Sequence, residues 1–194
     1  MKGIAAFGLG IFLFMRPVSV AAGAPEDQVR QSVDKLLAIL SDPRLKQEGK
    51  KNERREELKK VIYQRFDFTE MARRSLGPEW RRHTSEEQKE FVKLFTDLLE
   101  RAYLDRIESY NGEKVQYLGE REDHGYAEVQ TKLVNNKGQE FSINYRLHNV
   151  NGDWKVYDVV GEDISVVNNY RAQFSHVLAS SSYQELIHRM KEKI

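Results

Sequence analysis

The chain has no cysteine among its 194 residues, and this absence excludes disulfide bonds and thiolate chemistry together. A secreted domain of fewer than about 80 residues commonly needs such covalent staples, but a chain of this length can bury a sufficient core without them. The sequence also lacks a linker rich in proline, glycine or serine, and no segment repeats at a fixed period. We therefore expect a single folded domain, spanning residues 25–194.

An excess of charge of either sign is also missing. The chain carries 31 basic and 30 acidic residues, which give a formal net charge of +1. Nucleic acid is usually bound by strongly basic surfaces, and this chain has no excess of basic residues that would form one. We expect no nucleic-acid partner.

Long hydrophobic runs are absent except at the N-terminus, where apolar residues extend from Ile4 to Met15. This run of about 12 residues is too short to span a bilayer, which takes about 20. A lysine precedes it and small residues follow it, which is typical of a secretory signal peptide. We predict a signal peptide over residues 1–24, with cleavage after Ala22 or Ala24. A retained N-terminal anchor is the alternative.

Motifs of catalysis and of metal binding are missing as well. The sequence has no HExxH zinc motif, no GxSxG elbow, no phosphate-binding loop and no calcium loop. The five histidines show no ligand spacing, and we expect them to be solvated: His83, His124, His148, His176 and His188. No motif in the sequence therefore points to an enzyme, a cofactor or a metal site.

One acidic cluster remains as the alternative for chemistry, because Asp158, Glu162 and Asp163 fall within six residues around one glycine. Asp158 lies near the end of an expected strand, where it can pair with Arg146 or Arg171. Glu162 or Asp163 precedes an expected helix, and a carboxylate there satisfies free backbone amides. A structural role is the expectation for this cluster, and a catalytic or metal-binding role is the rival.

Helical spacing of apolar residues dominates the first half of the chain. Asp67 with Glu70, and Thr84 with Glu87, have the form of capping boxes. The spacing predicts four helices, at about residues 29–41, 58–66, 68–76 and 84–110.

The apolar period changes to two after Gly112. Turn residues at 123–125, 135–138 and 149–152 divide the region into four strands, which predicts an antiparallel meander with one wet face. Helical spacing returns after Val160, and a last helix is expected from Tyr183 to about Lys193. The fold class is therefore α+β, with N-terminal helices, a four-stranded antiparallel meander and C-terminal helices.

Five separated motifs carry a resemblance to a known family. The chain resembles the MlaC family of periplasmic phospholipid-binding proteins, also called toluene-tolerance auxiliary components of an ABC transport system. The similar motifs occur in family order from about Val29 to Leu186: FDF before a short helix, LGPEW, TSEEQ at the start of the long helix, WKVYD in a strand, and a glycine followed by NYRAQF.

This resemblance implies a soluble periplasmic carrier that shelters phospholipid and catalyses no reaction. Its implied partners are phospholipid, the MCE protein of an inner-membrane ABC transporter, and an outer-membrane lipoprotein associated with porin. Such a carrier serves the lipid asymmetry of the outer membrane. A hopanoid or another apolar lipid is the alternative cargo, because related proteins associated with hopanoid synthesis share the family pattern.

A carrier of this kind needs an apolar cavity between its helices and its sheet. Burying one methylene contributes about 0.8 kcal/mol, so a 16-carbon tail represents roughly 12 kcal/mol of gross transfer free energy. We predict that the cavity walls are inward residues of the long helix, the third and fourth strands and the following helix, namely Phe95, Leu98, Leu99, Tyr103, Phe141, Ile143, Tyr145, Trp154, Val156, Val167, Tyr170 and Phe174.

Overall fold

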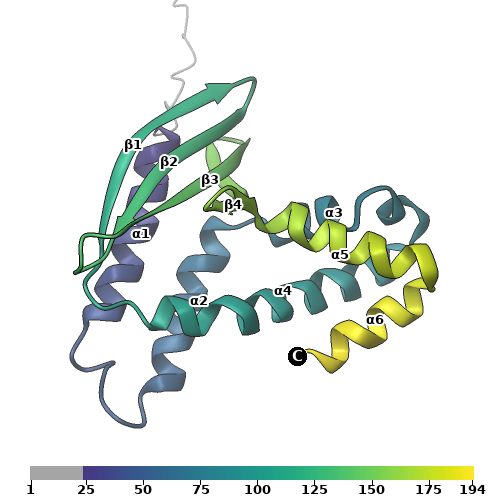
Figure 1. Cartoon of the computed structure of the whole chain (residues 1–194), viewed down its shortest axis with the longest axis horizontal. Coiled ribbons are helices and arrows are strands. Elements are labelled where there is room, and N and C mark those ends of the chain that lie inside the picture. The colour runs from purple at the N-terminus through teal and green to yellow at the C-terminus, as the bar shows by residue number, and fades with distance from the viewer. Residues whose placement is uncertain (1–23) are drawn as a thin grey trace, which may run out of the picture.

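The structure is a computed structural model that describes residues 24–194 (Figure 1). The predicted signal peptide, up to residue 23, lies outside the described residues. Among the described helices, none is long and apolar enough to cross a membrane. The helices are α1 (Pro25–Ser41), α2 (Lys51–Arg65), α3 (Phe68–Leu76), the 3-10 helix η1 (Gly77–Arg82), α4 (Ser85–Glu108), α5 (Val166–Ser180) and α6 (Tyr183–Glu192).

The helix boundaries follow the predicted caps closely. Thr84 and Glu87 form a complete capping box at the start of α4, and the Asp67 side chain accepts from the backbone N–H of Glu70 at the start of α3. The second helix departs from the prediction because it begins at Lys51, well before its apolar stripe. Its first two turns are charged or polar on every side, so they show no apolar period.

The sheet is antiparallel throughout, in the order β1-β2-β3-β4-β5. Its strands are β1 (Lys114–Asp123), β2 (Tyr126–Val134), β3 (Glu140–Val150), β4 (Asp153–Gly161) and β5 (Ile164–Ser165). The α+β class is confirmed, but the prediction of four strands is wrong by one. Two residues are too few to show an alternating pattern, so β5 leaves no periodic signal.

A β-bulge changes which face the residues of β4 occupy. Arg146 of β3 pairs with Asp158, whereas the next residue, Leu147, pairs with Val156, so Tyr157 is an extra residue in β4. Val159 then pairs with Tyr145 and shares a face with Leu147 and Val156. Asp158 consequently points to the opposite face.

Helix α1 covers one face of the sheet, where it packs against β1 and β2 (Figure 1). The buried residues between them form one core cluster, which we call the sheet cluster: Val29, Ala127, Val129, Leu147, Trp154 and Val156. A short parallel bridge between Phe66 and Val156 ties the end of α2 to β4, and the backbone N–H of Asp67 donates to the carbonyl of Val156 at 2.8 Å.

The C-terminal helices and α3 pack around α4 to form the larger core, which we call the helical cluster. Its buried residues are Met71, Ala72, Leu76, Phe91, Leu94, Phe95, Leu98, Leu99, Val167, Phe174, Tyr183, Leu186, Ile187 and Met190. Phe66 packs against both this cluster and the sheet cluster. The side chain at the α2–α3 joint therefore connects the two cores.

Candidate functional site

The structure places ten of the twelve predicted cavity residues in or against the two cores. Phe95, Leu98, Leu99, Val167 and Phe174 are buried in the helical cluster. Tyr103 and Tyr170 pack against that cluster, and the rings of Phe95 and Tyr170 meet edge to face with centroids 5.3 Å apart. These seven residues lie together in or against the helical cluster, and four of them are aromatic.

The remaining predicted residues belong to the sheet. Trp154 and Val156 are buried in the sheet cluster, and Tyr145 packs against it. Phe141 and Ile143 belong to neither cluster, and Phe141 is 40% exposed. A single cavity that all twelve residues enclose therefore stays a prediction.

The strand register arranges apolar residues in rows across the face that α1 partly covers. Leu133 of β2 pairs with Val115 on one side and with Phe141 on the other. Thr131 pairs in the same way with Tyr117 and Ile143. Paired residues of an antiparallel sheet share a face, so each row is continuous over three strands. Sequence reasoning proposed the β3 members only, because the rows depend on register that alternation within one strand does not reveal.

This surface, which we call the apolar rows, consists of Val115, Tyr117, Leu133, Phe141, Ile143, Tyr145 and Val159. All of its members are half-buried except Phe141, which is exposed. Large side chains on a core-facing surface are usually fully buried, and contiguous apolar surface left accessible marks a place where another apolar group binds. The rows are therefore a part of the sheet where apolar side chains keep some accessible surface.

The two tyrosines in the rows are in an environment of low polarity. Burial raises the pKa of Tyr145 to about 12, with no other cause. Burial likewise raises the pKa of Tyr117, and the neighbouring phenol of Tyr145 adds to the rise. Both phenols therefore stay protonated at neutral pH, and each can donate a hydrogen bond.

The three carboxylates of the acidic cluster do not converge. Asp158 is buried, and its carboxylate accepts from the Ser165 hydroxyl at 2.6 Å and from the backbone N–H of Val167 at 3.0 Å. Glu162 is exposed and instead accepts from the backbone N–H of Ser142 at 2.5 Å. Among the described residues, no group of three or more potential ligands is placed to hold a metal ion.

The prediction that Glu162 or Asp163 caps the following helix is wrong. Both residues have positive φ, 47° and 64°, and they form the two-residue turn between β4 and β5. The cap of α5 is Ser165, whose hydroxyl accepts from the backbone N–H of Asn168. Asp158 does pair with Arg146, one of the two predicted partners, at 3.3 Å.

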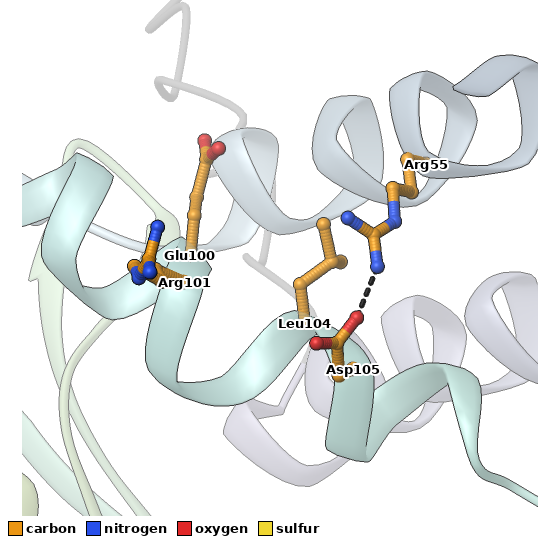
Figure 2. A pocket seen from close by; sticks show the side chains of 5 residues that line it. All are labelled: Arg55, Glu100, Arg101, Leu104 and Asp105. Atoms are coloured by element: carbon orange, nitrogen blue, oxygen red, sulfur yellow. Dashed lines mark hydrogen bonds and ion pairs between the residues drawn. The ribbon is translucent and has the colours of Figure 1, made fainter. Parts of the chain in front are cut away.

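Two hollows on the surface do not contain any predicted cavity residue. The first, of about 400 Å³, lies between α2 and α4 (Figure 2) and is lined by Arg55, Glu100, Arg101, Leu104 and Asp105. Figure 2 shows Arg55 of α2 directed at Asp105 of α4, with which it forms an ion pair. The second, of about 510 Å³, is lined by Arg146, Val160, Asp163, Ile164, Ser165, Asn168 and Asn169. The charged lining of the first hollow does not suit acyl chains.

Comparison with known proteins gives matches over most of the chain. Residues 30–192 match the family model described as MlaC protein. The chain is 24% identical over 194 residues to the intermembrane phospholipid transport system binding protein MlaC of Haemophilus influenzae, covering 97% of this chain and 90% of that protein. It is 25% identical over 174 residues to the toluene tolerance protein ttg2D of Pseudomonas putida, covering 88% and 81% of the two chains.

A solved structure has the same fold. It is the phospholipid-binding protein from Ralstonia solanacearum in complex with a phospholipid, which is 25% identical to this chain and superposes with a TM-score of 0.78. The match covers 87% of this chain and 96% of that one. The family model and the shared fold together show that this chain belongs to the MlaC protein family.

Proposed function

We propose that this chain is a periplasmic phospholipid carrier, exported by a signal peptide at residues 1–24 and folded as one domain over residues 25–194. It shuttles lipid between the MCE protein of an inner-membrane ABC transporter and an outer-membrane lipoprotein that is associated with porin. This exchange maintains the lipid asymmetry of the outer membrane. The lipid is cargo, and no cofactor or reaction is involved.

The observation that carries the proposal is the fold shared with a relative that holds a phospholipid. The apolar rows support it independently, because Leu133 lies between Val115 and Phe141 and all three retain accessible surface. Hydrocarbon removed from water onto such a surface contributes about 25 cal/mol for each Å² buried.

The twelve predicted residues remain our proposal for the lipid contacts, in two groups. Phe141, Ile143, Tyr145, Tyr103 and Tyr170 retain accessible surface and can contact an acyl chain directly. The other seven are buried, so they reach the lipid only if the sheet cluster and the helical cluster move apart: Phe95, Leu98, Leu99, Trp154, Val156, Val167 and Phe174. Phe66 packs against both clusters, so such a movement would separate its contacts with one of them.

Energetics explain why a carrier needs no strong head-group ligand. Two 16-carbon tails have a gross transfer free energy near or above the ceiling of about 20 kcal/mol on net affinity. Reorganisation of the protein must offset part of this, since otherwise lipid does not leave. Separating the sheet cluster from the helical cluster costs free energy, and this cost is the reorganisation that offsets part of the lipid affinity. The phosphate is charged and remains close to water.

The proposal is tested by transfer of a fluorescent phospholipid from vesicles to the purified protein. We expect the protein to remove probe from the vesicles and to elute with it in gel filtration. A hopanoid added as competitor distinguishes the two cargo classes. If the protein removes no phospholipid and binds no other lipid probe, its interior is solid, and the chain is an interaction module.

A further inference from the structure

Tyr117 is a polar residue in the middle of the apolar rows. It lies on β1, pairs with Thr131 of β2, and shares a row with Ile143 of β3. The guanidinium of Arg30 on α1 lies over its ring, 3.8 Å from the centroid. The ring is therefore held between α1 and the sheet, which fixes where its hydroxyl points.

The Tyr117 hydroxyl is buried, and no described residue offers it a hydrogen bond. Thr131, in the same row, differs because its hydroxyl donates to the carbonyl of Ile143. A buried polar group without a partner costs free energy, and folded proteins retain few of them. An unpaired hydroxyl on a surface that receives a ligand therefore indicates a partner supplied by that ligand.

Tyr145 brings a second phenol to the same surface. It packs against the same sheet cluster as Tyr117, and burial raises the pKa of its phenol. The two phenols are near enough to influence each other electrostatically. Both phenols can act as donors at neutral pH, whereas the Thr131 hydroxyl already donates to the carbonyl of Ile143.

We propose that the hydroxyl of Tyr117, with that of Tyr145 beside it, donates a hydrogen bond to an oxygen of the bound phospholipid's polar region. This inference rests on the proposed function. Acyl chains offer no acceptor, whereas ester carbonyl and phosphate oxygens are both acceptors. The bond positions the glycerol end of the lipid at the middle of β1 and directs the tails along the rows toward Phe141. It also selects a phospholipid over a plain hydrocarbon.

The test compares Tyr117→Phe with wild type, using three probes in delipidated protein. The probes are a diacyl phosphatidylglycerol, its diether analogue, which lacks ester carbonyls, and diphenylhexatriene, a fluorescent hydrocarbon without any oxygen. Tyr157→Phe is the matched control, because Tyr157 lies in the same sheet and packs against Arg74 on the opposite face.

We expect Tyr117→Phe to weaken diacyl lipid binding roughly three- to tenfold, the usual effect of one hydrogen bond. Binding of diphenylhexatriene should be unchanged, and Tyr157→Phe should match wild type with every probe. The loss disappears with the diether lipid if the acceptor is an ester carbonyl, and persists if it is a phosphate oxygen. Delipidated Tyr117→Phe should be at least as stable as wild type, since it loses only an unpaired hydroxyl.

Equal affinity of Tyr117→Phe and wild type for both phospholipids overturns the inference. An equal loss with diphenylhexatriene also overturns it, because packing and not a hydrogen bond would then be the cause. The proposed function survives either result as long as wild type binds the lipids. If wild type binds none of the three probes, the result contradicts the proposed function, and the inference that rests on it is contradicted as well.

Discussion

The hydroxyl of Ser165 donates to the carboxylate of Asp158 at 2.6 Å, and both residues are buried. Ser165 also caps α5, and Asp158 accepts from the backbone N–H of Val167 in the first turn of that helix. The pair therefore fastens the start of α5 to β4. A buried carboxylate whose oxygens are occupied by these donors and by Arg146 has a complete structural role.

Asp158→Asn should therefore destabilise the protein without removing lipid binding. The amide cannot accept as many hydrogen bonds as the carboxylate, and a loss of about 2 kcal/mol in the free energy of unfolding is expected. Urea unfolding measures the loss. The matched control is Glu162→Gln, because Glu162 is exposed and its amide oxygen can still accept from Ser142. A catalytic role would be indicated if Asp158→Asn left stability intact and abolished function.

Glu108 should make stability depend on pH. Burial alone would raise the pKa of this carboxyl, but hydrogen bonds from Arg55 and Arg54 outweigh burial and lower the pKa from its ordinary 4.5. The bonds from Arg55 Nε and Arg54 Nη2 measure 2.7 and 2.8 Å. They join α2 to the end of α4, beside the polar hollow of Figure 2.

Because the folded-state pKa of Glu108 is lowered, its stabilisation is fully present above the ordinary pKa and is lost as pH falls through the folded-state value. Glu108→Gln should cost about 2 kcal/mol at pH 7, and the difference from wild type should shrink below about pH 4.5. Urea unfolding between pH 7 and pH 3 tests this. Glu57→Gln, which alters an exposed pair with Lys60, should show little effect. A difference that stays constant with pH would be inconsistent with this role.

Ile143→Glu should block lipid uptake while preserving the fold. Ile143 is half-buried in the apolar rows, so the new carboxylate can reach water in the lipid-free protein but must lie beside acyl chains in the loaded one. We expect uptake to fall at least about tenfold. Asn144→Glu, one residue along β3 on the opposite face, is the matched control and should bind lipid normally. Equal uptake by both variants would place the acyl chains elsewhere.

Much of the fold could be predicted from local chemistry. Thr84 and Glu87 mark the start of α4 because the cap is made by residues three apart in sequence. The alternation of Phe141, Ile143 and Tyr145 on one face of β3 is likewise a local property, and the register confirms it. Helix ends and strand faces can therefore be predicted from the sequence, because residues close in the sequence determine them.

The remaining features depend on contacts between distant residues. The extra residue at Tyr157 in β4 moves Asp158 to the face opposite Val156, which simple alternation does not predict. The positive φ values of Glu162 and Asp163 arise from the turn into β5. The predicted cavity residues of the helices and those of the sheet belong to separate clusters, and Phe66 packs against both. The apolar period of one helix or strand does not predict how that element packs against the others.

The central claim is that acyl chains occupy the interior of this protein beside the apolar rows. Solvent extraction of the freshly purified protein, followed by mass spectrometry, tests it most directly. We predict that the extract contains phospholipid in near-stoichiometric amount although none was added during purification. An extract free of lipid, from protein that also takes up none from vesicles, would contradict the claim.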